Sequence, residues 1–201
     1  MPTFCAPIAA TAKAPAGWQL RSAAPDGGRH DMIEIRTERP HDIDQIRDVN
    51  ERAFGAPAEA HLVDRLRAAN KGAVSLVAED GDRIVGHILF SPVTVAHAPE
   101  FFRGVGLAPM SVLPEYQNQG IGSRLVRDGL SACQAAGFDI VVVLGHVGYY
   151  PRFGFVSAKE RGLENEYGVS DAFMVLELRA GALDAISGLV TFAPEFRETG
   201  C

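Results

Sequence analysis

One stretch of the chain, residues 113–125, constrains the fold more than any other, because it joins a strand to a helix through two glycines. The apolar residues 106–113 predict the strand, and helical spacing of apolar residues continues beyond the turn until Gly137. The turn reads Gln-x-x-Gly-x-Gly from Gln117 to Gly122. Unpaired N–H groups and the helix dipole favour an anion at such a helix N-terminus, and glycines let it approach the backbone. We therefore predict a phosphate-binding turn.

The remaining pattern predicts a mixed α/β fold. Helical spacing marks residues 43–54 and a second segment after Pro57, and Asp80-Gly81 is a strong hairpin signal. Pro109 interrupts its strand, so we expect a bulge or the end of pairing there. Strands are expected at residues 33–36, 74–79, 83–90, 106–113, 140–144 and 172–178, and a third helix at 122–136. With a short aromatic turn at 148–155 and a loop to residue 170, the order is β-α-α-β-β-β-α-β-α-β-β, a mixed sheet with helices on both faces.

The two ends of the chain differ from this patterned region. Residues 1–31 are rich in Ala, Pro and Gly without helical or strand period, so we expect a flexible N-terminal extension followed by a single domain over residues 32–201. A partner-binding arm is the alternative for the extension, and Met32 is an alternative natural start. Residues 180–196 either complete the sheet or pair with another chain, which would give a homodimer.

Net charge and cysteine content limit the classes of partner and the cellular setting that we expect. A net charge of −6 argues against a nucleic-acid binder and fits a cationic acceptor. Three cysteines lie far apart without a CxxC pair, which indicates a reduced, cytoplasmic setting. No apolar run reaches the length of a membrane span, so we expect no membrane partner. No His, Cys, Asp and Glu cluster has ligand spacing, so we expect no metal.

A second motif gives the chain a family resemblance. Residues 150–155, Tyr-Pro-Arg-Phe-Gly-Phe, look like the Tyr-x-x-x-Gly-Phe element that follows the fifth strand of GCN5-related N-acetyltransferases. Together with the turn, with residues 107–112 and with residues 143–145, this resembles the YhbS-like group of predicted N-acetyltransferases over roughly residues 33–192. The resemblance implies a twisted mixed sheet whose fourth and fifth strands splay apart. It also implies acetyl-CoA as co-substrate and transfer to a primary amine, of a small molecule or a protein, by direct attack in a ternary complex.

The same resemblance implies roles for particular residues. The Val112 N–H would bind the oxyanion as charge develops on the thioester. Tyr150 would protonate the departing thiolate, because a phenol stays protonated at neutral pH; Tyr149 is its rival, or packs against the coenzyme. Gln117 either contributes to the turn or is a surface residue that shapes it. The expected coenzyme-binding set is Ser111, Val112, Gln117, Asn118, Gln119, Gly120, Ile121, Gly122, Ser123 and Tyr149.

The general base is left open, because residues 105–113 contain no acid where many relatives carry a Glu. His146, just after the fifth strand, is our first catalytic candidate, although relatives often place a pantetheine-binding Asn there. Glu59, His61 and His87 are the other candidates. Cys133 is rejected as a nucleophile, since it has no motif around it. The alternatives to an acetyl-CoA-dependent N-acetyltransferase are a non-catalytic acyl-CoA-binding regulatory or sensor module, or an acyltransferase for a longer acyl-CoA.

Overall fold

The computed structural model describes residues 33–200, which form a mixed sheet covered by helices. The expected extension over residues 1–31 and Met32 lie outside the described residues. The α-helices are α1 (Ile43–Phe54), α2 (Ala58–Ala68), α3 (Ile121–Ala135) and α4 (Glu195–Thr199). The strands are β1 (Ile33–Thr37), β2 (Val74–Asp80), β3 (Arg83–Val95), β4 (Gly104–Val112), β5 (Ile140–Leu144), β6 (Val156–Ser157), β7 (Leu163–Asn165), β8 (Phe173–Glu177) and β9 (Gly188–Thr191). The 3-10 turns are η2 (Pro40–Asp42), η3 (Pro114–Tyr116), η4 (Tyr150–Phe153), η5 (Lys159–Arg161) and η6 (Leu183–Ala185).

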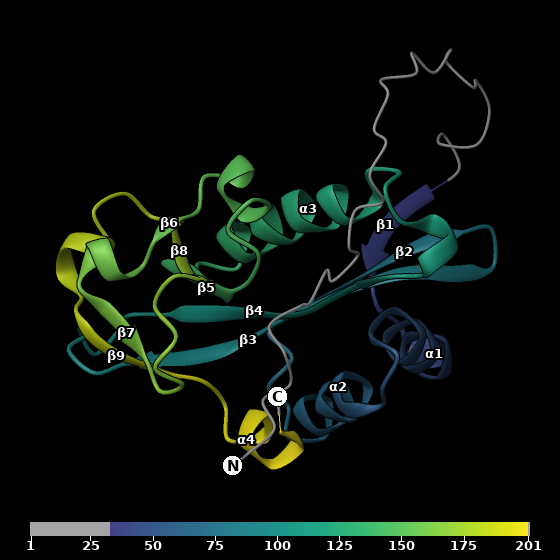
Figure 1. Cartoon of the computed structure of the whole chain (residues 1–201), viewed down its shortest axis with the longest axis horizontal. Helices are drawn as coiled ribbons and strands as arrows, with labels where there is room; N and C mark the ends of the chain where they lie inside the picture. The colour runs from purple at the N-terminus through teal and green to yellow at the C-terminus, as the bar shows by residue number, and fades with distance from the viewer. Residues whose placement is uncertain (1–32, 201) are drawn as a thin grey trace, which may run out of the picture.

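The helices lie on both faces of the sheet, as expected. The strand order is β1-β2-β3-β4-β5-β8-β6, and only the β4–β5 pair along this path is parallel. Figure 1 shows α3 on one face and α1, α2 and α4 on the other. Gly129 of α3 sits so close to the sheet that a Cβ there would lie 2.5 Å from the Phe90 ring, which fixes α3 tightly against β3.

A bulge interrupts the pairing of β3 with β4, as Pro109 led us to expect. Ile88 pairs with Met110 and Phe90 pairs with Leu107, so Leu89 alone faces two residues of β4, Ala108 and Pro109. Beyond the bulge the ladder resumes as far as the pair of Gly86 with Val112. Because proline has no N–H for a ladder bond, the extra residue falls where the ladder loses least.

Strands β4 and β5 separate partway along their length. They pair only where Gly104, Val105 and Gly106 face residues 140–142. From Leu107 to Val112 strand β4 has no β5 partner, while Val143 and Leu144 of β5 stay paired to β8. The predicted splay of the fourth and fifth strands is therefore confirmed, and it leaves one edge of β4 open.

The C-terminal segment completes the sheet of its own chain. Strand β9 pairs antiparallel with the end of β3, through Thr94 and Val95, and parallel with β7. After it, α4 lies against α2 (Figure 1), and the Lys71 ammonium lies 2.8 Å from the Glu195 carboxylate. Of the two expectations for residues 180–196, the intramolecular one is confirmed.

Strand β3 and the expected loop after the aromatic turn differ most from the expected pattern. Strand β3 runs to Val95 rather than to residue 90, because its far end pairs with β9. The short aromatic turn expected at residues 148–155 is present as the 3-10 turn η4, where the predicted element order counted a helix. The expected loop to residue 170 contains β6 and β7, which have two and three residues and are too short to show a strand period.

Candidate active site

The open edge of β4 ends at a backbone N–H that points away from β3. Leu113 N–H donates to the Val85 carbonyl at 2.9 Å, which makes the neighbouring Val112 and Gly86 a non-hydrogen-bonded pair. The Val112 N–H and C=O therefore face the side of β4 from which β5 has diverged. The Gln117 side-chain amide donates to the Val112 carbonyl at 3.0 Å, so the turn is tied to the end of the strand.

The predicted phosphate turn, residues 117–122, and Ser123 after it present a run of unpartnered backbone N–H donors. No backbone N–H from residue 118 to residue 123 donates to an acceptor of the described residues, and the first helical bond runs from Arg124 N–H to the Gly120 carbonyl at 3.0 Å. The Gln117 N–H donates to the Pro114 carbonyl at 3.3 Å within η3. The run therefore starts one residue later than the motif indicated. No side chain caps α3, so its dipole and free N–H groups are available to an anion.

Two residues of the turn have left-handed backbone conformations that let its N–H groups converge. Asn118 has φ of 60° and Gly120 has φ of 83°; asparagine and glycine are the residues that tolerate this region best. Space is tight at Gly122, because a Cβ there would lie 3.1 Å from the Tyr149 hydroxyl and 3.4 Å from the Met110 sulfur. The side chain of Gln119 donates back to the Glu115 carbonyl at 3.0 Å, so it helps to hold the shape of the turn.

The two tyrosines differ in their surroundings. Tyr149 is half-buried, and its hydroxyl lies 3.4 Å from the Ser123 hydroxyl, beside the turn. Tyr150 is buried, and its hydroxyl has no hydrogen-bond partner among the described residues. Burial, with a smaller contribution from Tyr149, raises the pKa of Tyr150 above its ordinary value, so the phenol stays protonated. Gly145 makes room for this ring, since a Cβ there would lie 2.2 Å from it.

His146 supports the turn that carries both tyrosines. Its carbonyl accepts from Tyr149 N–H at 2.9 Å, and its Nδ1 accepts from Gly148 N–H at 3.1 Å. The ring is exposed. These contacts give His146 a visible part in shaping the segment, while its other ring nitrogen stays open to solvent.

Ser111 lies on the opposite face of β4 from the turn. It pairs with His87, whose ring contacts Asn50 of α1, whereas Met110 contacts Gly122 of α3. The Ser111 hydroxyl is buried without a partner among the described residues. The structure thus places Ser111 and the turn on opposite faces of the same strand end, with the Val112 N–H between them.

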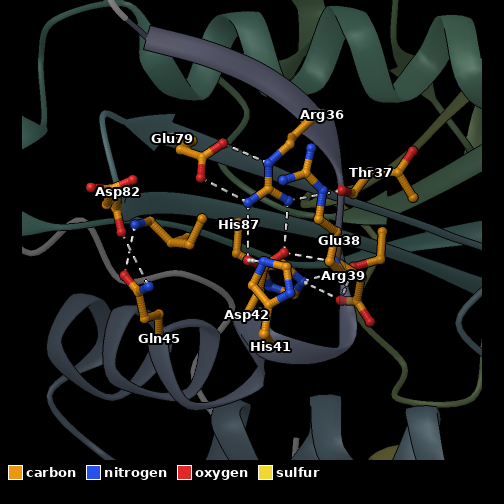
Figure 2. Close-up of polar contacts among 12 residues, drawn as sticks. Arg36, Thr37, Glu38, Arg39, His41, Asp42, Gln45, Glu79, Asp82 and His87 are labelled. Carbon is orange, nitrogen blue, oxygen red and sulfur yellow. Dashed lines mark hydrogen bonds and ion pairs between the residues drawn. The ribbon is translucent and has the colours of Figure 1, made fainter.

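His87 belongs to an ion-pair cluster near α1 that has two parts: Arg36 with Asp42 and Glu79, and Glu38 with Arg67, Ser75 and His87. Figure 2 shows Arg36, Glu38, Asp42, Glu79 and His87 of this cluster. His87 is fully buried, with Nε2 3.0 Å from the Ser75 hydroxyl and Nδ1 3.3 Å from the Asn50 amide. Burial lowers its pKa, although the neighbouring Glu38 opposes this. Both ring nitrogens are occupied, so the structure gives His87 a place in the core rather than at the turn.

Further candidates from the sequence lie apart from the turn. Glu59, at the start of α2, is buried, and His61 is exposed on the same helix. Cys133 is buried, and burial raises the pKa of its thiol to about 12, which confirms its rejection as a nucleophile. Within residues 33–200 no group of His, Cys, Asp and Glu side chains could hold a metal ion, and no helix is long and apolar enough to cross a membrane.

Sequence reasoning missed two arginines beside the turn. The Arg152 guanidinium lies over the Tyr149 ring at 4.6 Å, and Arg127 lies over the Phe153 ring at 5.5 Å. Arg152 stands inside the motif of residues 150–155, but the motif is defined by its Tyr, Gly and Phe. Only the folded arrangement brings α3 and η4 together here.

Comparisons with known proteins agree with this geometry. The family described as acetyltransferase (GNAT) domain matches residues 34–158. YhbS of Escherichia coli strain K12, described as an uncharacterized N-acetyltransferase, is 37% identical over 164 residues, which cover 81% of this chain and 97% of YhbS. A crystal structure of Escherichia coli YhbS in complex with CoA superposes with a TM-score of 0.79 at 36% identity, covering 83% of this chain and 92% of that one.

A second solved structure has a similar sequence identity to this chain. It is a GNAT family acetyltransferase from Brucella melitensis in complex with acetyl-CoA, with a TM-score of 0.69 and 38% identity over 83% of this chain and 99% of that one. The family match spans more than half of the chain, and YhbS is covered almost completely. This chain therefore belongs to the GNAT family of acetyltransferases, and it is an acyltransferase of the N-acetyltransferase class.

Proposed function

We propose that the protein transfers an acetyl group from acetyl-CoA to a primary amine, of a small molecule or a protein, by direct attack in a ternary complex. The observation that carries the proposal is the run of unpartnered N–H groups over residues 118–123, which ends beside the open edge of β4. The relatives from Escherichia coli and Brucella melitensis, solved with CoA and acetyl-CoA, support the same co-substrate.

The turn would hold the diphosphate of the coenzyme. Its free N–H groups and the dipole of α3 supply donors and partial positive charge without a cationic side chain. Gly120 would keep the backbone accessible, and the Ser123 hydroxyl would add a contact. The pantetheine arm would then lie along the open edge of β4, where strand-like hydrogen bonds to the β4 backbone replace those that β5 does not make.

The reacting groups would meet at the end of β4. The neutral amine nitrogen attacks the thioester carbon, and the carbonyl oxygen takes up negative charge beside the Val112 N–H. One well-placed backbone donor of this kind lowers the activation barrier by about 3 kcal/mol. The C–S bond then breaks, Tyr150 gives its proton to the thiolate, and the amine nitrogen loses a proton as the amide forms.

The proton acceptor for the amine would be His146, which is exposed beside the two tyrosines, or a solvent-borne base. Strand β4 carries no carboxylate, and both ring nitrogens of His87 are engaged. Holding the amine and the thioester in line removes a large entropic part of the barrier, so a solvent-borne base is sufficient for this proposal.

Calorimetric titration with acetyl-CoA tests the proposal, with Gly120→Glu as the disruptive variant. Glutamate at φ of 83° adds strain and a negative charge where the diphosphate would lie. Gly81→Glu is the matched control, because Gly81 also has positive φ and open space around it, but lies in the β2–β3 turn. Micromolar binding that only Gly120→Glu abolishes would support the proposal. Absence of binding to the unmodified protein would overturn it.

Titration with longer acyl-CoAs distinguishes the acyl groups. An acetyl-specific enzyme loses affinity or turnover as the chain lengthens, whereas an enzyme for longer acyl groups gains both. Once the coenzyme is bound, release of free thiol in the presence of candidate amines identifies the acceptor class.

A further inference from the structure

Two exposed arginines form a row with two aromatic rings beside the phosphate turn. Arg152 lies 4.6 Å from the centroid of Tyr149, and Arg127 lies 5.5 Å from the centroid of Phe153. The two rings pack edge to face, with centroids 5.4 Å apart. Stacking on a ring restricts a guanidinium and leaves its N–H groups free to bind an anion.

The row begins at the turn and runs outward. The Tyr149 hydroxyl lies 3.4 Å from the Ser123 hydroxyl, in the first turn of α3. Arg127 follows Ser123 by four residues, so it stands one helical turn further along the same face. The open edge of β4 is buried at Val112, whereas both arginines are exposed. A ligand bound at the turn would therefore reach the strand edge with its inner part and the arginines with its outer part.

Neither arginine is neutralised by an acid. Within the described residues most other arginines form ion pairs with carboxylates, namely Arg36, Arg47, Arg52, Arg65, Arg67, Arg83, Arg179 and Arg197. Among residues 33–200 no carboxylate lies within ion-pair distance of Arg127 or Arg152, and Arg152 makes only one hydrogen bond, to the Gly148 carbonyl at 3.2 Å. In a protein of net charge −6, two fixed and unpaired cations at one place point to an anionic ligand.

We propose that Arg127 and Arg152 bind the ribose 3′-phosphate of coenzyme A, so that the protein selects the 3′-phosphorylated coenzyme over its dephospho form. This inference rests on the proposed function, because it assumes that the diphosphate occupies the turn. The N–H groups of residues 118–123 serve the diphosphate, and they leave the third phosphate, one ribose away, without donors. A phosphate monoester carries close to two negative charges at pH 7, and a guanidinium can donate two parallel hydrogen bonds to it.

Titration with CoA and with 3′-dephospho-CoA, for the unmodified protein, Arg127→Gln and Arg152→Gln, tests the inference. We expect the unmodified protein to bind CoA about tenfold or more tightly than dephospho-CoA, as loss of charge-assisted hydrogen bonds would give. Each variant should weaken CoA binding roughly tenfold and leave dephospho-CoA binding nearly unchanged, which isolates the contact between side chain and phosphate. Raising the ionic strength should shrink the preference.

Arg103→Gln is the matched control. Arg103 is also exposed and lies over an aromatic ring, Phe138, at 4.4 Å, but near the C-terminal end of α3. Its removal should affect both ligands equally or not at all. Equal weakening of CoA and dephospho-CoA by the Arg127 and Arg152 variants would overturn the inference, as would equal affinity of the unmodified protein for both ligands. Absence of binding of either ligand to the unmodified protein would overturn the proposed function itself.

Discussion

The phosphate turn and the ion-pair cluster use polar groups in opposite ways. Over residues 118–123 the backbone N–H donors have no partner among the described residues. In the ion-pair cluster each charged group has a partner: Arg36 binds both Asp42 and Glu79 (Figure 2), and Glu38 accepts from Arg67 and Ser75. Unpartnered N–H donors at a helix N-terminus are available to an anionic ligand. Polar groups that already have partners within the protein stabilise the fold instead. The two regions should therefore respond to mutation in different assays.

Loss of Asp42 should give the largest effect, on stability alone. Its side chain is 2% exposed and its Oδ2 lies 2.7 Å from Arg36, whose side chain is 8% exposed. The hydrogen bonds from Arg36 hold the pKa of Asp42 below its ordinary value. Asp42→Ala leaves the guanidinium buried beside one fewer charge, so we expect the free energy of unfolding in urea to fall by about 3–5 kcal/mol.

Asp44→Ala is the control for that variant, because Asp44 is exposed in the first turn of α1. Asp44→Ala should lower the free energy of unfolding by less than about 1 kcal/mol. Under conditions where Asp42→Ala is folded, its affinity for acetyl-CoA should equal that of the unmodified protein. A large loss of coenzyme affinity in folded Asp42→Ala would show that the cluster and the turn are not separate in function.

Tyr150→Phe should show the converse, a loss of turnover without loss of stability. The hydroxyl has no partner among the described residues, so its removal should change the free energy of unfolding by less than about 1 kcal/mol. If it donates the proton to the thiolate, kcat should fall about 100-fold. Tyr149→Phe, beside the turn, is the matched control and should reduce kcat far less. Unchanged turnover of Tyr150→Phe would remove Tyr150 from the mechanism.

Of the two regions, only the phosphate turn could be predicted from sequence patterns, because its residues are contiguous along the chain. Residues 113–125 contain strand end, turn and helix start in one continuous stretch, so their role could be inferred from glycine positions and apolar spacing. The ion-pair cluster could not be inferred this way, because Arg36 and Glu79 meet only through the pairing of β1 with β2. The space that Gly145 gives to the Tyr150 ring is equally invisible in the sequence.

The same limit applies to the arginine row and to the short strands. Arg127 meets Phe153 only because α3 and η4 pack on the same side of the sheet. Strands of two or three residues, such as β6, are held by pairing to a neighbour and not by their own pattern. Contacts between distant segments decide both features, and a single sequence contains no periodicity that reports them.

The pH dependence of stability should report the buried His87. Its pKa is lowered by burial, so as pH falls below about 6.5 the unfolded chain binds a proton before the folded one does. The free energy of unfolding should therefore fall by up to about 1.4 kcal/mol for each pH unit below 6.5. The depressed pKa values of Glu38 and Asp42 add a loss only below about pH 4.5.

Urea unfolding between pH 7 and pH 5 measures this slope. His87→Gln should flatten it, while His97→Gln, which changes an exposed histidine, should leave it as it is. A slope in His87→Gln as steep as in the unmodified protein would mean that another group takes up the proton.

The smallest expected effect concerns the link between the turn and β4. The Gln117 amide bonds to the Val112 carbonyl at 3.0 Å, whereas the Gln119 amide bonds to Glu115 at 3.0 Å within the same turn. Loss of one neutral hydrogen bond changes a binding free energy by about 1 kcal/mol. Gln117→Leu should therefore weaken acetyl-CoA binding several-fold, because the N–H groups of the turn lose their fixed position relative to Val112. Gln119→Leu should change it less than twofold. Equal effects of the two variants would mean that Gln117 merely stiffens the turn.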